Sequence, residues 1–138
     1  MRQSTTRLAI ATPGRGLLEI TGEVAGWVAA QNMREGLLTL FCRHTSASLT
    51  IQENAAPAVK DDVMAWLDRL APEGGHYAHG DEGPDDMPAH LKAVLTGVSL
   101  SVPLIGGRLA LGTWQGIYLV EHRRAAHRRQ VALHLLGD

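Results

Sequence analysis

Cysteine is nearly missing from this sequence, in which Cys42 is the single example among 138 residues. An intramolecular disulfide is therefore excluded, and the composition suits a reducing compartment. Cys42 ends an apolar stretch, residues 37–42, in which alternate side chains share one face of a predicted strand. We therefore expect a buried, unreactive thiol and not a nucleophile.

Long apolar runs and an excess of one charge are missing as well. A formal net charge of −1 creates no overall attraction to nucleic acid or to an anionic membrane. No segment approaches the ~20 apolar residues of a membrane span, and the apolar run at residues 8–11 is too short for the core of a signal peptide. The glycine-rich phosphate-binding motif of P-loop proteins does not occur either. We expect a soluble, cytoplasmic protein with neither nucleic-acid nor membrane partners.

The order of the predicted elements indicates a single α+β domain that spans residues 1–138. A chain of this length can bury roughly two thirds of its unfolded surface. Its helices and strands alternate too unevenly for a doubly wound sheet, so a mostly antiparallel sheet or sandwich with two or three helices fits best. Apolar patterning predicts strands at 5–11, 17–21, 37–42, 48–52, 98–104, 109–112, 116–121 and 130–136. It predicts helices at 23–31, at 56–70 and from Pro88 to about residue 95.

Three local features refine this prediction. The helix at 56–70 carries an apolar stripe at helical spacing, with Trp66 as a core residue and Asn54 as the helix cap. Residues 17–21 could pair back onto the first strand. Residues 105–108 have the sequence of a hairpin turn between two strands.

Polar residues that core packing does not explain are concentrated at residues 79–90. This stretch, HGDEGPDDMPAH, holds two histidines, three aspartates and one glutamate around two glycines. Such a loop can turn sharply and direct imidazoles and carboxylates to one point, as metal binding or acid–base chemistry requires. A merely solvated acidic loop is the alternative. We predict an active site that includes this loop.

A cluster of hydroxyl side chains follows His44 at the end of a predicted strand. Thr45, Ser46 and Ser48 could bind phosphate oxygens through their hydroxyl and backbone N–H groups. An ordinary turn has the same composition and is the alternative.

The candidate metal ligands are His44, His79 and His90. If the three imidazoles converge, they form a three-histidine site that leaves one position open for water or substrate. The loop also offers carboxylates that could fix the imidazole tautomers: Glu82, Asp85 and Asp86. Convergence of the three rings is a prediction that only the tertiary structure tests.

Two further motifs are ambiguous. Residues 122–129, HRRAAHRR, gather four arginines and two histidines, which suits a local anion site but is more often a solvated basic run. Residues 112–116, GTWQG, form either a turn that lets the backbone approach a ligand closely or a simple hairpin corner.

Three motifs in this order closely resemble the YjbQ-like family, described as secondary thiamine-phosphate synthases. They are HTSASLTIQEN (44–54), HGDEGPDDMPAHLK (79–92) and GRLALGTWQGIYLVEHR (107–123). The resemblance implies a compact α+β subunit that assembles as a homotrimer. It places the recurrent histidines of the family at His44, His79 and His90, around a metal or an anion. Its other recurrent polar positions match Glu53, Asn54, Asp61, Gln115, Glu121 and Arg129.

The resemblance also implies a reaction, the coupling of an aminopyrimidine diphosphate to a thiazole phosphate with release of pyrophosphate. Such a displacement needs positive charge near the leaving diphosphate, from a divalent metal or from arginine. We expect Glu53 and His44 to be catalytic. We expect the small phosphorylated substrate to be bound by Thr45, Ser46, Ser48, Asn54, Gln115 and Arg129.

The identity of the metal leaves alternatives open. Magnesium prefers oxygen ligands, whereas three histidines suit zinc or another transition metal. A metal-dependent hydrolase of a small phosphorylated metabolite is therefore a second candidate. A non-catalytic protein that binds a metabolite or a metal is a third, because no pair of nucleophile and base is evident from the sequence.

Overall fold

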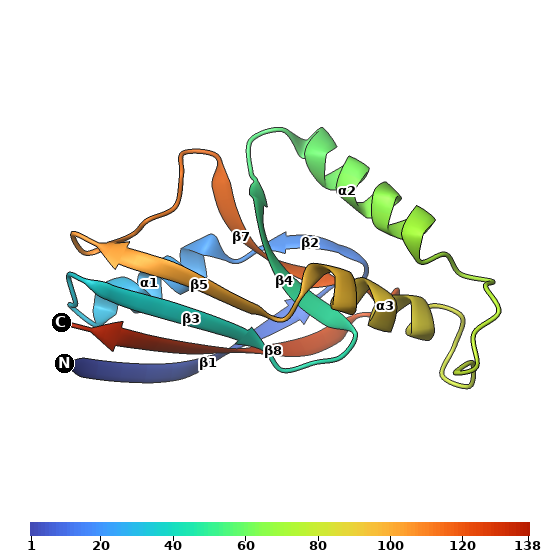
Figure 1. Ribbon diagram of the computed structural model, residues 1–138, viewed down its shortest axis with the longest axis horizontal. Helices are drawn as coiled ribbons and strands as arrows, with labels where there is room; N and C mark the ends of the chain where they lie inside the picture. The colour runs from blue at the N-terminus through green and yellow to red at the C-terminus, as the bar shows by residue number, and fades with distance from the viewer.

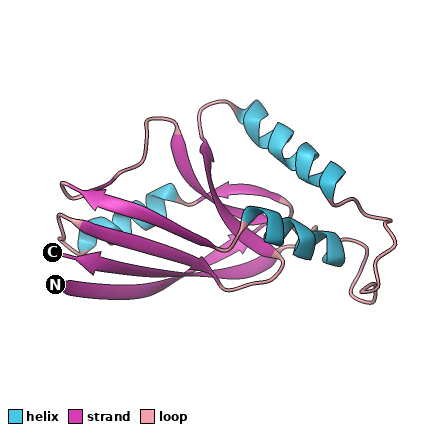
Figure 2. Ribbon diagram, viewed as in Figure 1, coloured by secondary structure: helices cyan, strands magenta, loops and turns pink.

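Eight strands form two antiparallel sheets, and three helices pack on them (Figures 1 and 2). The computed structural model describes residues 1–138. The strands are β1 (Arg2–Thr12), β2 (Gly16–Glu19), β3 (Gly36–Cys42), β4 (Ala47–Glu53), β5 (Ser99–Ile105), β6 (Arg108–Leu109), β7 (Gln115–Glu121) and β8 (His127–Gly137). The helices are α1 (Thr21–Ala30), α2 (Pro57–Leu70) and α3 (Asp86–Thr96). None of them is long and apolar enough to cross a membrane.

The larger sheet has the strand order β1-β8-β3-β5-β6, and the smaller one the order β2-β7-β4. Both termini lie side by side at one end of the molecule, where the N-terminal amine pairs with Asp138 (Figure 1). The loop that precedes α3 and the first turns of that helix lie at the opposite end. The predicted α+β class, a mostly antiparallel sheet or sandwich with two or three helices, is confirmed, and the number of helices is three.

The second strand departs from its predicted pairing. Residues 16–19 pair with β7, from Glu121 to Tyr118, and not with β1. The chain crosses to the smaller sheet after Gly14, where an added Cβ would lie 2.7 Å from the carbonyl oxygen of Arg124. Such a close backbone approach requires glycine. The hairpin turn between β5 and β6 is confirmed, with positive φ at Gly106 and Gly107 as in a type I′ turn.

A cluster of 17 buried apolar residues connects both sheets with α1. Alternate residues of β3, namely Leu38, Leu40 and Cys42, point into it as predicted. Burial raises the pKa of the Cys42 thiol, so this side chain contributes to packing as an apolar residue. Packing in the core therefore determines which side chains of β3 face inward. It thereby also determines the point at which residues 43–45 leave the sheet.

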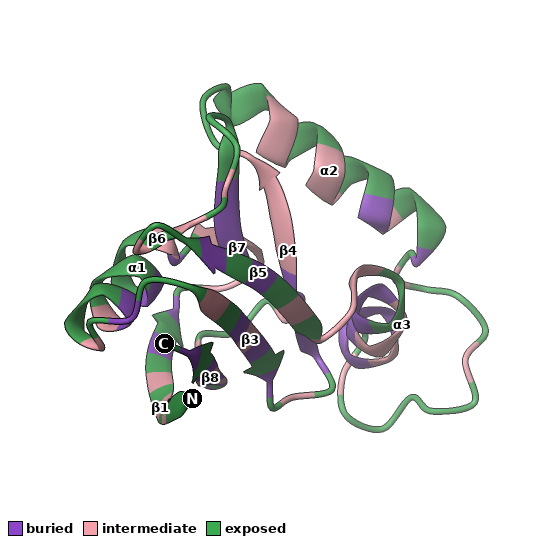
Figure 3. Ribbon diagram, turned by 60° about the vertical axis from the view of Figure 1, so that its left-hand side comes forward, coloured by how far each residue is buried: buried purple, intermediate pink, exposed green.

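Helix α2 is less buried than its sequence predicts. Its only buried residue is Leu67, and Trp66 is 49% exposed. Most of the helix is exposed or only partly buried (Figure 3). The prediction of Trp66 as a core residue is therefore wrong for the single chain, because α2 covers the sheet by one narrow face. Asn54 is not the cap either, since Glu53 Oε2 accepts a hydrogen bond from the N–H of Ala56 at 2.9 Å, just before the helix begins.

Helix α3 is fastened to β4 by buried polar contacts. Ser48 Oγ is hydrogen-bonded to Thr96 Oγ1 near the end of the helix and lies 2.8 Å from Nε2 of His122. Ser48 and His122 are both buried, so this serine–histidine pair stabilises the fold and is closed to substrate. Burial, together with the positive charge of Lys92, lowers the pKa of His122 to about 3.

The buried His122 predicts acid sensitivity of the fold. Between about pH 3 and pH 6.5, the unfolded chain binds a proton at His122 and the folded protein does not. The free energy of unfolding should therefore fall as the pH is lowered through this window. His122→Phe should flatten that slope in urea unfolding measured at stepwise pH, whereas the exposed His76→Phe should not. Equal slopes for wild type and His122→Phe would contradict the assignment.

The unequal burial of neighbouring residues in α2 gives a second prediction. Leu67→Ala should lower the free energy of unfolding by about 2–5 kcal/mol, the usual cost of truncating a buried leucine. Trp66→Ala should cost less, because about half of its side chain already contacts solvent. Urea denaturation of both variants tests this order. A reversed order would mean that another subunit covers the indole.

Candidate metal centre

Four side chains near the start of α3 converge at one point. His79, Glu82, Asp86 and His90 each offer a ligand atom, and these atoms lie within 4.8 Å of one another. Oδ2 of Asp86 lies 2.9 Å from Nε2 of His79 and 3.1 Å from Nε2 of His90. Two of the three predicted histidines therefore meet, with their ring centroids 5.8 Å apart.

The helix begins earlier than its sequence predicts, and this places Asp86 in the cluster. Helix α3 starts at Asp86, so Asp86 and His90 are four residues apart on one helical face. Pro88 suggested a later start, but proline is tolerated throughout the first turn, where a backbone N–H has no partner within the helix. The spacing of four residues between Asp86 and His90 was a signal in the sequence for this pair. The predicted start at Pro88 hid it, because it left Asp86 outside the helix.

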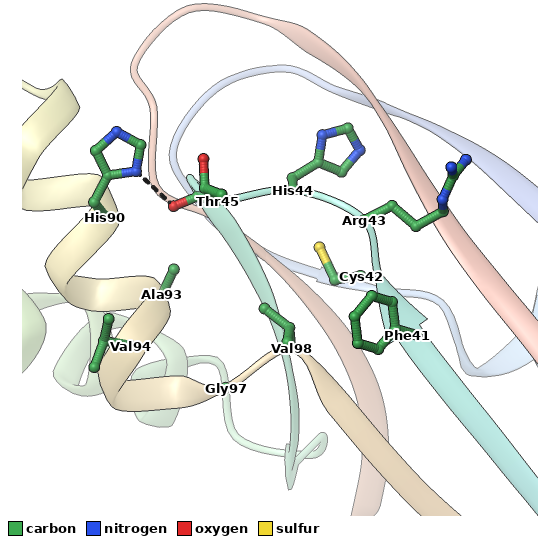
Figure 4. A pocket seen from close by; sticks show the side chains of 10 residues that line it. All are labelled: Phe41, Cys42, Arg43, His44, Thr45, His90, Ala93, Val94, Gly97 and Val98. Atoms are coloured by element: carbon green, nitrogen blue, oxygen red, sulfur yellow. Dashed lines mark hydrogen bonds between the residues drawn. The ribbon is translucent and has the colours of Figure 1, made fainter.

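The hydrogen bond made by His90 determines its tautomer. Nδ1 of His90 lies 2.7 Å from the carbonyl oxygen of Thr45 (Figure 4). A carbonyl can only accept, so Nδ1 carries a proton and Nε2 of a neutral ring carries the lone pair. That lone pair faces the Asp86 carboxylate at 3.1 Å. Either a second proton on the ring or a cation between the two atoms relieves this contact.

Charges around the cluster keep Asp86 ionised. Its side chain is only 3% exposed, and burial alone would raise its pKa. The hydrogen bond from His79 and the charges of His90 and Arg123 outweigh burial and lower the pKa of Asp86. The same bond to Asp86, aided by Asp81 and Glu82, raises the pKa of His79.

The ligand set fits a transition metal. Two imidazoles and two carboxylates are typical of zinc and its neighbours, whereas magnesium and calcium are usually held by oxygen atoms alone. A backbone carbonyl that fixes the imidazole tautomer, as Thr45 does for His90, is a usual accompaniment of a metal-binding histidine. Glu82 is mostly exposed and is the ligand most readily replaced.

His44 does not belong to this cluster, so the predicted three-histidine site is wrong within one chain. Its Nε2 accepts a hydrogen bond of 2.7 Å from the backbone N–H of Gln130 on β8. Burial and the positive charge of Arg129 lower its pKa, which favours a neutral ring that carries its proton on Nδ1. The imidazole of His44 lies against β8 because the backbone of residues 43 and 44 still runs beside that strand.

A pocket of about 710 Å³ adjoins the cluster between the end of β3 and α3 (Figure 4). His44, Thr45 and His90 form part of its lining. Much of the remaining wall is apolar and is contributed by Phe41, Cys42, Ala93, Val94 and Val98. The imidazole of His90 therefore borders both the pocket and the candidate metal centre.

Three predicted phosphate ligands serve the fold instead. Arg129 donates from Nε to Glu121 at 2.8 Å and from Nη2 to Ser46 Oγ at 3.0 Å, and all three residues are buried. Ser48 is held by His122 in the same interior region. The assignment of Ser46, Ser48 and Arg129 to phosphate is corrected, because their polar atoms are already paired. Thr45, which was predicted to bind phosphate together with them, is exposed and lies beside the pocket.

The remaining predicted residues lie at the far end of β4 and β7. Glu53 and Gln115 are register partners there, and Asn54 follows directly. The seven residues of β4 separate Glu53 from the His44 end by roughly 20 Å at about 3.3 Å per residue. Glu53 and His44 therefore cannot act on one substrate within a single chain, since a short strand keeps its ends apart.

The basic run after β7 neutralises acidic residues. Arg123 pairs with Asp85 and Asp86, Arg124 with Glu73, and Arg129 with Glu121. The anion site, the less favoured of the two interpretations of residues 122–129, is not formed by these three arginines. The matching acidic loop and basic run were visible in the sequence, but their pairing depends on tertiary contacts.

Comparisons with known proteins agree with this architecture. The family model described as UPF0047 protein YjbQ-like matches residues 6–138. A UPF0047 protein of Synechocystis is 46% identical over 138 residues, which cover 99% of this chain and 94% of that protein. The UPF0047 protein YjbQ of Escherichia coli is 41% identical over 132 residues, which cover 95% and 96% of the two chains.

Solved structures have the same fold. A YjbQ/UPF0047 protein from Clostridium acetobutylicum matches with a TM-score of 0.88 and 36% identity, covering 95% of this chain and 99% of that one. A protein of unknown function from Sulfolobus solfataricus matches with a TM-score of 0.89 at 23% identity, covering 99% and 100% of the two chains. The chain therefore belongs to the YjbQ-like UPF0047 family.

Proposed function

We propose that this protein is an enzyme that holds a divalent transition metal, such as zinc, at His79, Asp86 and His90, and acts on a small phosphorylated metabolite. The observation that carries the proposal is the contact of 3.1 Å between Nε2 of His90 and the Asp86 carboxylate. With Nδ1 of His90 donating to Thr45, a cation between these atoms satisfies both of them.

The reaction that the family resemblance favours is the coupling of an aminopyrimidine diphosphate to a thiazole phosphate. Departure of a diphosphate requires positive charge close to its oxygens, which the bound metal would supply. The exposed Glu82 could yield its position to a substrate oxygen. The apolar wall of the adjoining pocket suits a heteroaromatic ring, and Thr45 and the Nδ1–H of His44 are candidate donors to polar groups on the substrate.

Participation of Glu53, Asn54 and Gln115 would require a second copy of the chain. We propose a homotrimer, as the family resemblance implies, in which this end of β4 lies against the metal centre of a neighbouring subunit. Exposed apolar side chains beside the pocket support assembly, since Phe41 is 47% and Val94 is 82% exposed. Closed cyclic symmetry is a common way to cover such surfaces.

Hydrolysis of a phosphorylated metabolite is the second candidate reaction. The two imidazoles of the cluster favour zinc over magnesium, and zinc sites with an exchangeable position commonly serve hydrolysis. The two imidazoles among the four candidate ligands are the observation that favours this alternative.

Metal binding is tested first. Metal-stripped protein should take up Zn²⁺, and a free concentration 100 times the dissociation constant should raise the free energy of unfolding by about 2.7 kcal/mol. His90→Ala should lose this stabilisation, because it removes a ligand from a preformed site. His76→Ala, from the same loop but outside the cluster, is the matched control. No zinc-dependent stabilisation of the wild type, measured by urea denaturation, would refute the metal centre.

The reaction is tested with stripped and zinc-loaded protein, each with both substrates together and with each alone. Coupling predicts thiamine phosphate and pyrophosphate only when both substrates are present, and loss of both products in His90→Ala but not in His76→Ala. Release of inorganic phosphate from one substrate alone would favour the hydrolase. Zinc binding without turnover of either substrate would contradict both enzymatic proposals and leave a binding protein.

A further inference from the structure

The loop that carries His79 and Glu82 is connected to the body of the protein by two arginines. Other hydrogen bonds of residues 72–85 remain within the loop or reach α3, such as that from Tyr77 to the carbonyl of Pro72. Contacts from outside come from Arg123 and Arg124, which follow β7. The side chain of Arg124 holds the loop at Glu73, close to the end of α2. The segment that carries Glu82 and Asp85 is held by the side chain of Arg123.

Arg123 contacts the residues on which the candidate metal centre is built. Its Nη1 donates to Oδ1 of Asp86 at 2.8 Å, its Nη2 to the carbonyl oxygen of Glu82 at 3.0 Å and its Nε to Asp85 at 3.1 Å. Only the planar fork of a guanidinium can satisfy three acceptors in these directions at once. By contrast, the side chain of Arg124 pairs with Glu73, away from the cluster.

Arg123 is itself held in place by the sheets. Its backbone N–H donates to Oε2 of Glu121 at 3.1 Å, and the Glu121 carboxylate is buried against Arg129 and Thr12. The guanidinium therefore extends from a fixed point at the end of β7. A candidate ligand that Arg123 holds from this fixed point, such as the Asp86 carboxylate, needs little reorganisation when an ion binds.

We infer that Arg123 is the positioning residue of the candidate metal centre and contributes to its selectivity. It holds the Glu82 backbone and occupies Oδ1 of Asp86, so that Asp86 offers only Oδ2 to an ion. A site with one oxygen from this carboxylate and two imidazoles disfavours Ca²⁺, which takes six to eight oxygen ligands. This inference rests on the proposed metal-dependent function.

The test compares Arg123→Gln with Arg124→Gln, which removes the same charge from the adjacent residue. Zn²⁺ affinity, measured by competition with a chromophoric chelator, should fall 10- to 100-fold in Arg123→Gln, as is typical when a partner of a metal ligand is lost. It should be unchanged in Arg124→Gln. Arg123→Lys should also bind zinc more weakly, because an ammonium group cannot replace the fork. Wild-type affinity in both Arg123 variants would overturn the inference.

A metal-free measurement separates this inference from the proposed function. NMR spectra of the histidine imidazoles in stripped protein should show altered His79 and His90 signals in Arg123→Gln but not in Arg124→Gln. If the wild type binds no zinc while these signals respond, the metal-dependent function fails and the positioning by Arg123 stands. Unaltered signals in folded Arg123→Gln would refute the positioning role, whatever the wild type binds.

Discussion

The hydrogen bonds to the buried carboxylate of Glu121 are the interactions on which the arrangement of the two sheets depends. The carboxylate accepts hydrogen bonds from Thr12 on β1, from Arg129 on β8 and from the backbone of Arg123 after β7. One side chain thus connects the larger sheet with the smaller one. Burial disfavours its charge, but the bonds from Arg129 and Thr12 outweigh this and lower the pKa of Glu121. Removal of one partner from such a buried pair typically costs about 3–5 kcal/mol.

The same carboxylate determines where the candidate metal centre lies. From Glu121 the connection runs through Arg123 to Asp86, and from Asp86 to His79 and His90. Helix α3 reaches this point because Ser48 and Thr96 fasten its other end to β4. The exposed loop and the first turns of α3 thereby hold His79 and His90 in a fixed geometry. This explains how the candidate site can form on a segment with little apolar packing of its own.

The two ends of β4 separate the polar residues of the family motifs into two groups. His44 and Thr45 lie beside the candidate metal centre, whereas Glu53, Asn54 and Gln115 lie at the far end of the strand pair. A rigid β-ladder holds these groups apart, so they can act together only across a subunit boundary. This division is one structural argument for the homotrimer that we propose.

The sequence by itself determined the strands, the three helices and the polarity of the loop at residues 79–90, because apolar periodicity and turn residues are local properties. It also pointed to His79 and His90 as candidate metal ligands. Only the tertiary structure decided that Asp86 joins them and that His44 turns to Gln130. It also decided that Arg123, Arg124 and Arg129 pair with carboxylates. These outcomes depend on the start of α3 and on contacts between residues tens of positions apart. Such contacts are fixed by the packing of the two sheets, which no local pattern specifies.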